Sequence, residues 1–188
     1  WSMEIPWLVV AGFLITAVLE KTGLMKRLAY NSILLTGGSF KGIIVGILLT
    51  GTILSFLIAD VTAKAVLIGA LALSICKALN LELGNRAASA IGATAWMAVS
   101  GTSYLVYTGS TGNLVPFGLA GNMGVQIPSY VQYMLHMFVP QLVYIIICTV
   151  VILLIFKPEK EIESKEYFKQ EKDKLRKVKV DVWKVIVI

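Results

Sequence analysis

Two long apolar stretches of this chain are interrupted by polar, helix-breaking residues. The first interruption, Ser55–Lys64, lies inside the run from Gly42 to Leu79, and the second, Tyr107–Asn113, lies inside a run that begins at Ala87. Hydrocarbon offers no partner to backbone N–H and C=O groups, so non-helical backbone survives at membrane depth only where it is buried in protein or lines a wet cavity. Interrupted apolar segments of this kind are typical of the binding sites of secondary transporters. The sequence therefore predicts part of a membrane carrier.

The distribution of charge supports a membrane protein and argues against a nucleic-acid-binding one. Hydrophobic residues make up 57% of the 188 residues, above the roughly 45–50% of soluble domains. Residues 87–156 contain no Asp, Glu, Lys or Arg, and the net charge of +6 belongs largely to one flank and the tail. No soluble domain with a basic face is visible. A nucleophile–base–acid set is also missing, since the only histidine is His136, so we expect no enzyme activity.

The length and flanking charges of the first run predict a re-entrant helical hairpin at about 42–79. A bilayer core needs about 20 residues of helix, so this run is too long for one span and slightly short for two straight ones. Lys41 precedes the run and Lys77 lies at its far end, which places both ends on the same side. A hairpin that enters and leaves from one face, with its tip at Asp60, fits the length and the charge together.

The second run predicts a broken helix at about 87–119. We expect helix through Tyr107, a break at Thr108–Gly112 and a short resumed piece from Asn113. A final crossing follows at about 130–156 and is expected to bend at Pro140.

These elements combine into a transmembrane transporter region at 1–156. It opens with a short crossing at 6–19 and an interfacial amphipathic helix at 22–35. A charged cytoplasmic linker is predicted at 157–182, and the apolar residues 183–188 indicate the start of a further segment of a longer protein. The basic residues of this layout all fall on one side, so the positive-inside rule makes that side, and the tail from Lys157, cytoplasmic. We expect a multi-pass protein of the cell membrane.

The two interruptions supply the candidate binding groups. The hairpin tip carries Ser55, Asp60 and Thr62, together with freed backbone groups. The second break carries further polar and flexible residues, namely Thr108, Gly109, Ser110, Thr111, Gly112 and Asn113. The N-terminal ends of the resumed half-helices suit an anionic carboxylate or sulfate, so we assign Asp60, Thr62, Ser110, Thr111 and Asn113 to substrate binding. Hydroxyls and unwound carbonyls are hard ligands suited to Na⁺, and we expect no other metal or cofactor.

Among the polar residues of the two breaks, Lys64 has the largest free-energy cost of transfer into the membrane. A lysine in the bilayer interior costs about 2.5–3.5 kcal/mol on insertion scales and needs a partner. Three alternatives remain open from the sequence: an ion pair with Asp60 one turn earlier, an ammonium that takes the place of a sodium ion, or a side chain that snorkels to a cytoplasmic cavity. Ser55, Asp60 and Gly109 carry oxygens suited to a cation, and Lys64 carries an ammonium that takes the place of one in the second alternative. We group these four residues as ion-binding or ion-replacing.

Several stretches of the chain resemble the divalent anion:sodium symporter family of the ion transporter superfamily. The resemblance lies in Glu20–Leu24, Lys26–Ala29, Leu54–Phe56, Gly109–Leu114 and Phe138–Pro140, and in the order of elements, which matches the later part of the family's first inverted repeat. The resemblance implies a carrier of dicarboxylate, citrate or sulfate, and a site built from the hairpin tip and the broken helix.

The chain departs from the family pattern at both breaks. The family's tip motif Ser-Asn-Thr, which contacts substrate carboxylate and sodium, is Ala59-Asp60-Val61 here, although Ser55 matches a family hydroxyl at the sodium site. In the family's Gly-Thr/Ser-Pro-Pro-Asn motif, Thr111-Gly112 replaces the two prolines, while Gly109, Ser110 and Asn113 remain. These departures put sodium coupling and a dicarboxylate substrate in question.

The sequence thus predicts an all-α integral membrane fold, one half of an inverted-repeat secondary transporter that moves small anions by alternating access. The alternatives are a proton-coupled or exchange-type carrier of the same superfamily, or a non-transporting membrane subunit. The expected partners are a small anionic substrate, the lipid bilayer, the second half of the same transporter and a second copy in a homodimer, with no nucleic acid.

Overall fold

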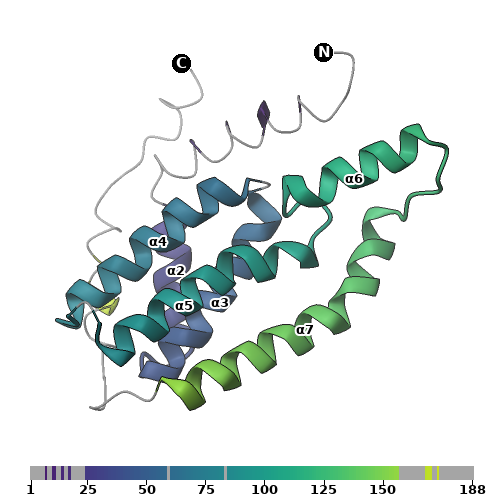
Figure 1. Ribbon diagram of the computed structural model, residues 1–188. Helices are drawn as coiled ribbons and strands as arrows, with labels where there is room; N and C mark the ends of the chain where they lie inside the picture. Colours follow the sequence, from purple (N-terminus) through teal and green to yellow (C-terminus); the bar gives the residue numbers. More distant parts are fainter. Residues whose placement is uncertain are drawn as a thin grey trace.

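The computed structural model describes residues 24–58, 60–82 and 84–156, together with Trp7, Val10, Ala11, Leu14, Ala17, 168–170 and Asp173. The described residues form α-helices and one short 3-10 helix (Figure 1), which confirms the all-α expectation. Three of the described helices are long and apolar enough to cross a membrane: Phe40–Leu57 (α3), Val61–Ala78 (α4) and Tyr130–Ile155 (α7). The predicted crossing at 6–19 lies largely outside the described residues, and the segment at 183–188 lies wholly outside them.

The first interruption separates α3 from α4. Helix α3 begins after Ser39, whose hydroxyl accepts a hydrogen bond from the Gly42 N–H at 3.2 Å, and it ends at Ile58, where the backbone becomes extended. Helix α4 begins after Asp60, whose carboxylate accepts a hydrogen bond from the Ala63 N–H at 2.6 Å. A carboxylate at this position also interacts favourably with the positive end of the helix dipole. Asp60 therefore starts the second arm of the hairpin.

Helix α5, Arg86–Ser100, packs against both α3 and α4, which contact each other far less. At the crossing of α3 and α5, Gly51 lies so close to Ala98 that a Cβ atom at position 51 would overlap the Ala98 carbonyl. Small residues allow helices in membranes to approach this closely. The surrounding core is built mainly from buried aliphatic side chains, among them Ile43, Ile47, Leu54, Ile68 and Ile91.

The second interruption begins earlier than the sequence pattern predicts. The α-helix ends at Ser100, continues as the 3-10 helix η1, Gly101–Leu105, and resumes as α6, Thr111–Asn122. The hydroxyls of Thr102 and Ser103 donate back to the carbonyls of Ala98 and Val99, and such back-bonding weakens and bends helices. The prediction of helix through Tyr107 therefore places the end of the α-helix too late. It was based on the apolar content of the segment, which these local hydrogen bonds do not change.

Helix α7 returns along the broken helix (Figure 1). It begins at a capping box in which the Ser129 hydroxyl accepts from the Gln132 N–H and the Gln132 side chain accepts from the Ser129 N–H. The ribbon is bent, as expected for a helix with Pro140 in its interior. Most of its apolar side chains are exposed on the described part of the chain, for example Leu135 and Ile147, which suits contact with lipid or with further protein.

Helix α2, Leu24–Leu35, falls where the interfacial helix was predicted and packs on α3. Its Tyr30 is buried, and the ring centroid of Phe168 lies 6.0 Å from that of Tyr30. Phe168 belongs to the predicted linker 157–182 and is fully buried. At this residue, therefore, the tail packs against the helical body.

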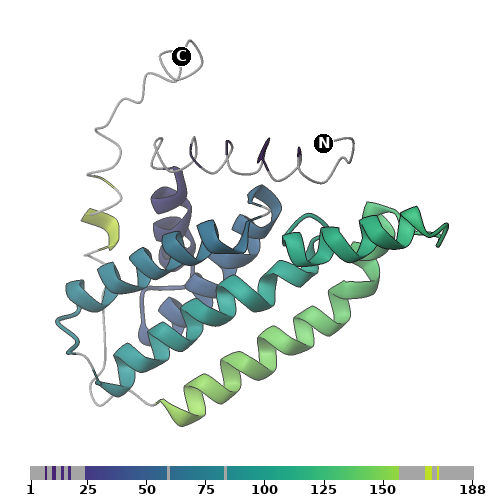
Figure 2. The ribbon, with the colours of Figure 1, turned by 45° about the horizontal axis from the view of Figure 1, so that its top comes forward.

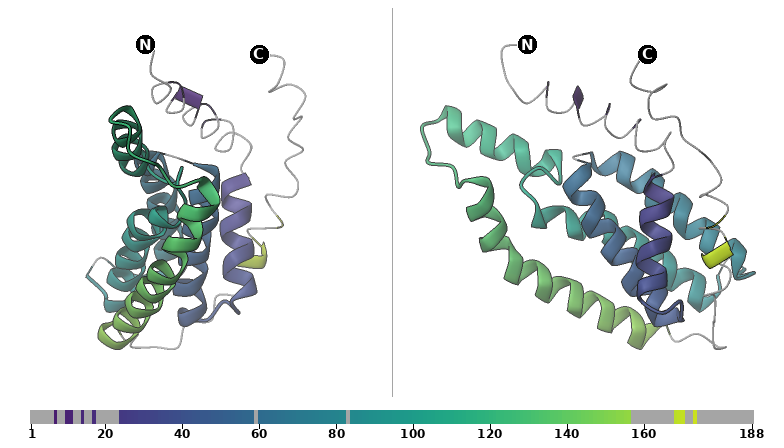
Figure 3. Two further views of the ribbon diagram at one scale, coloured as in Figure 1. Left: turned by 90° about the vertical axis from the view of Figure 1, so that its right-hand side faces the viewer. Right: turned by 180° about the vertical axis from the view of Figure 1, so that it is seen from behind.

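The ends of the helices separate the molecule into two sides. Figure 1 shows the start of α3, the end of α4, the start of α5 and the end of α7 at one end, and the turn between α6 and α7 at the other. The junction of α3 and α4 lies between these ends, next to the junction of η1 and α6, and Figures 2 and 3 agree. This is the arrangement that a re-entrant hairpin requires. Its position in a bilayer stays a prediction.

Candidate functional site

Lys64 joins the two interruptions. It lies in the first turn of α4, and its side chain is fully buried. Its Nζ atom donates to the Ser55 Oγ at 3.4 Å, to the Ser103 Oγ, and to the carbonyl oxygen of Gly109 at 2.5 Å. The ammonium therefore contacts the end of α3, the 3-10 helix and the turn before α6 at once.

The hydroxyls around this ammonium are arranged as acceptors. Ser55 donates its own hydroxyl hydrogen to the Gly51 carbonyl at 2.9 Å, and Ser103 donates to the Val99 carbonyl at 2.6 Å. Each hydroxyl has one hydrogen and two lone pairs, so the lone pairs of both residues remain for the ammonium. Thr102 extends the cluster, with its Oγ1 3.2 Å from the Ser55 Oγ. Neutral hydroxyl and carbonyl oxygens of this kind are also suitable ligands for a hard cation.

The Gly109 carbonyl is fixed by a tight turn. The Gly109 N–H donates to the Val106 carbonyl at 2.9 Å, and a Cβ atom at position 109 would overlap the carbonyl oxygen of Ser103. Only glycine fits this turn without displacing the backbone that carries Ser103. This close packing explains why the break carries glycine at position 109.

Asn113 and Ser110 hold the second break together. The Asn113 side chain is buried, and its Nδ2 donates to the carbonyls of Ser103 and Val106, both at 3.2 Å. Ser110 caps α6 by accepting a hydrogen bond from the Gly112 N–H at 3.0 Å. Both side chains thus stabilise the break itself, in addition to any contact with a substrate.

Asp60 and Lys64 do not form the ion pair that one of the sequence alternatives requires. Asp60 is half-buried and uses its Oδ1 to cap α4, while Lys64 turns to the oxygens of the other break. The remaining predicted residues lie near the starts of the half-helices: Thr62 is exposed in the first turn of α4, and Thr111 is half-buried at the start of α6. Snorkelling of Lys64 is also excluded by its complete burial.

The sequence did not identify the groups of α7 and η1 that support the site. The Gln141 Nε2 donates to the Gly101 carbonyl at 2.5 Å, and the Tyr133 hydroxyl donates to the Tyr104 carbonyl at 2.9 Å. These bonds flank Ser103 on both sides. The signals that were available were the weak helix formers Gly101–Ser103 and an isolated Gln141 within an apolar crossing.

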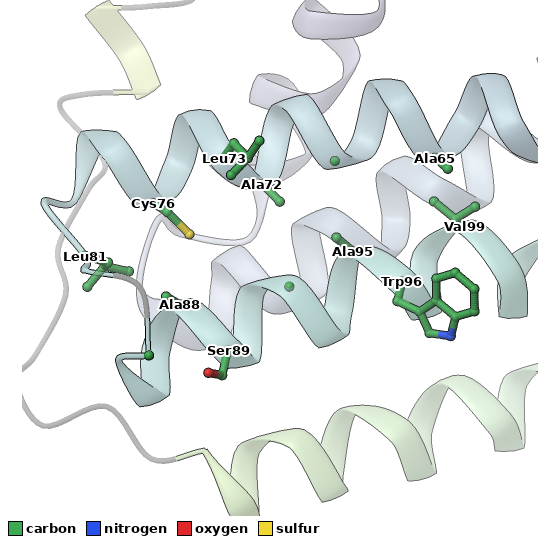
Figure 4. A pocket seen from close by; sticks show the side chains of 13 residues that line it. Ala65, Ala72, Leu73, Cys76, Leu81, Ala88, Ser89, Ala95, Trp96 and Val99 are labelled. Atoms are coloured by element: carbon green, nitrogen blue, oxygen red, sulfur yellow. The ribbon is translucent and has the colours of Figure 1, made fainter.

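A separate groove of about 480 Å³ runs between α4 and α5 (Figure 4). It is lined by small and apolar side chains, including Ala65, Leu73, Cys76, Ala88 and Trp96. The oxygens that contact Lys64 do not line it. The polar site therefore lies at the two breaks and not in this groove.

Comparison with known proteins identifies the family. The family model described as the sodium:sulfate symporter transmembrane region matches residues 1–188. No curated protein matches the chain. The family resemblance read from the sequence motifs is thereby confirmed.

Proposed function

Since this chain belongs to the sodium:sulfate symporter transmembrane region family, we propose that it carries a small anion across the membrane by alternating access. In this proposal Lys64 is a fixed cation in the half-site that the two breaks form. The observation that carries the proposal is the set of contacts from the buried Lys64 ammonium to Ser55, Ser103 and the Gly109 carbonyl. A sodium ion in the same place would use the same oxygens.

The anion is proposed to bind between the start of α6 and the hairpin tip. The first turn of α6 provides a positive dipole end and backbone N–H groups, with the Thr111 hydroxyl beside them. Ser110 and Asn113 keep this end in place through the hydrogen bonds described above. Asp60 and Thr62 lie at the start of α4, at the other break. Half-helix termini that point at a substrate are a recurrent arrangement in carriers of this kind.

The fixed ammonium sets the coupling that we expect. A sodium ion within about 4 Å of it would be repelled by about 4 kcal/mol at an effective dielectric near 20. This half-site should therefore hold no sodium ion, and the sodium gradient should contribute little here. Because a covalently attached cation cannot leave with the substrate, anion exchange fits this half-site better than sodium symport.

The test is transport by the full encoded protein reconstituted into liposomes. Uptake of radiolabelled sulfate, succinate and citrate is measured with sodium, potassium or choline outside, and with unlabelled anion inside to detect exchange. We expect uptake of at least one of these compounds, changed by less than about two-fold when potassium replaces sodium. In the double variant Asp60→Asn, Lys64→Ala, the competing ammonium is gone, so dependence on sodium should rise.

Two results would contradict the proposal in different ways. If none of the three anions enters or exchanges, the protein is not the carrier that we propose. Strong sodium dependence of the unmodified protein that disappears in Ser55→Ala would show that sodium binds here in spite of Lys64. Lys77→Ala, at the exposed far end of α4, is the matched control and should behave as the unmodified protein does.

A further inference from the structure

The groove between α4 and α5, with a volume of about 480 Å³, lies outside the polar site at the two breaks. Small residues keep it open, because a Cβ atom at Gly69 or Gly92 would meet no atom within 4 Å. Leu73 and Trp96 line the groove and are 59% and 70% exposed. The described residues therefore leave an apolar surface uncovered along two neighbouring helices.

The groove has the length of one leaflet of a bilayer. Figure 4 shows Cys76 and Ala88 toward one end and Ala65 and Val99 toward the other. At the helical rise of about 1.5 Å per residue, the distance along α4 from Ala65 to Cys76 is about 16 Å. Half of a hydrocarbon core of about 30 Å is about 15 Å. An acyl chain that lies along the groove would thus extend over the length of its own leaflet.

The groove is too narrow to enclose a helix. A volume of about 480 Å³ spread over a length of about 16 Å gives a mean cross-section of about 30 Å². An α-helix with its side chains is about 10–12 Å across, which corresponds to a cross-section of roughly 80–110 Å². A chain of methylene groups is thinner and adapts its shape, so it can fill the groove and gain dispersion contacts with the lining.

The charged residues of this region lie at one end of the groove. None of the residues that line it is charged. Lys77, in the last turn of α4, and Glu82, in the turn that joins the helices, are both exposed, and their charges offset each other. Arg86, exposed at the start of α5, gives this end its net positive charge. A cation at the start of a helix opposes the helix dipole, whereas an anion bound there interacts favourably with the dipole and with Arg86.

We propose that this groove binds one acyl chain of an anionic phospholipid, whose negatively charged headgroup binds Arg86. Arginine can donate two parallel hydrogen bonds to a phosphate. In the orientation predicted from the sequence, this end of the groove faces the cytoplasmic leaflet, which anionic lipids make negative. The groove does not include the residues of the two breaks, so the inference holds whatever the protein transports.

The test measures which lipid reaches Trp96. The full encoded protein, in a variant that keeps Trp96 as its only tryptophan, is reconstituted into phosphatidylcholine liposomes. Increasing amounts of phosphatidylglycerol or phosphatidylcholine that carry bromine along the acyl chain are included, because bromine quenches tryptophan fluorescence on contact. One basic residue near an anionic headgroup strengthens binding by about five-fold. We therefore expect half-maximal quenching at a mole fraction of brominated phosphatidylglycerol about five-fold lower than that of brominated phosphatidylcholine.

Two pairs of variants locate the lipid. Arg86→Gln should abolish the preference for phosphatidylglycerol, whereas Lys41→Gln, at an exposed lysine at the same end of the molecule, should keep it. Gly69→Leu places a side chain in the groove and should also abolish the preference. Ala70→Leu adds the same side chain at an exposed position of α4 that does not line the groove, and it should keep the preference.

Several results would overturn the inference. Equal quenching by the two brominated lipids would show contact with bulk lipid only, and absence of quenching by both would show that another part of the full protein covers the groove. A preference that survives Arg86→Gln or Gly69→Leu would place the lipid elsewhere.

Thermal unfolding of the unmodified protein in detergent gives a second measurement. Added phosphatidylglycerol should raise the unfolding temperature more than added phosphatidylcholine does, because a ligand that binds only the folded state stabilises it. An equal effect of the two lipids would contradict a site that selects an anionic headgroup.

Discussion

The ammonium of Lys64 donates a hydrogen bond to the carbonyl oxygen of Gly109 at 2.5 Å, across 45 residues of sequence. This bond joins the two interruptions, because Lys64 lies in the first turn of α4 and Gly109 lies in the turn before α6. A helix break frees carbonyl groups that need partners, and a fixed cation satisfies one of them without a bound ion. The following predictions test that arrangement and the fold around it.

Replacement of Lys64 by methionine should lower the stability of the protein and weaken transport, because the methionine side chain fills the place that a sodium ion would need in order to replace the ammonium. Methionine fills a similar volume, but the buried carbonyl of Gly109 loses its donor, which costs about 1–3 kcal/mol. Thermal unfolding in detergent measures the effect. Lys77→Met is the control, since Lys77 is exposed on the same helix and surface substitutions usually change stability by about 0.5 kcal/mol or less. Equal shifts in the two variants would show that the ammonium does not hold the breaks together.

The overall fold could be predicted from the sequence because membrane constraints leave few choices. The apolar runs predicted helices in the regions that α3, α4 and α7 occupy. That α3 and α4 form a re-entrant hairpin stays a prediction. Helix starts were also readable, since Ser39, Asp60, Ser110 and Ser129 are ordinary N-cap residues. The end of α5 was not readable, because the hydrogen bonds of Thr102 and Ser103 do not alter the apolar pattern.

The site could be predicted only in part, because its partners are distant in sequence. The sequence pointed to Ser55, Lys64 and Gly109 separately. Nothing in their spacing indicated that the Lys64 ammonium would donate to the Gly109 carbonyl and not pair with the Asp60 carboxylate. That choice depends on how α5 packs between the hairpin arms and brings η1 to the tip. Ser103 was missed for the same reason, since it was assigned to intact helix.

The crossing of α3 and α5 should be sensitive to the size of residue 51. Gly51→Ala places a Cβ atom against the Ala98 carbonyl and side chain, and overpacking of this kind typically costs about 1–3 kcal/mol. Gly69→Ala, in the middle of α4, meets no atom within 4 Å. It should be neutral or stabilising by up to about 1 kcal/mol through helix propensity. Thermal unfolding of the two variants in one detergent gives the comparison, and a smaller loss for Gly51→Ala than for Gly69→Ala would contradict the observed crossing.

Gln141 should act as a positioning residue for the 3-10 helix. Gln141→Leu removes the donor to the Gly101 carbonyl and leaves a buried acceptor unsatisfied, at a cost of about 1–3 kcal/mol. Because Ser103 lies in the same 3-10 helix, we also expect sodium to affect transport more strongly in this variant than in the unmodified protein. A merely structural role would lower stability without altering the response to sodium. The control is Gln126→Leu, in the exposed turn before α7.

The hairpin should enter and leave the membrane from one face. In a background where Cys76 and Cys148 are replaced by alanine, single cysteines at Lys41, Lys77 and Gly121 are labelled with a membrane-impermeant maleimide in oriented vesicles. Lys41 lies in the first turn of α3 and Lys77 in the last turn of α4, at the end of the molecule where α5 starts. Gly121 lies in the last turn of α6, at the opposite end. All three positions are exposed. We expect Lys41→Cys and Lys77→Cys to react from the cytoplasmic face and Gly121→Cys from outside. Reaction of the first two from opposite faces would make α3 and α4 ordinary spans and would place Asp60 and Lys64 near the outer surface, where a buried cation could no longer serve a site at the middle of the membrane.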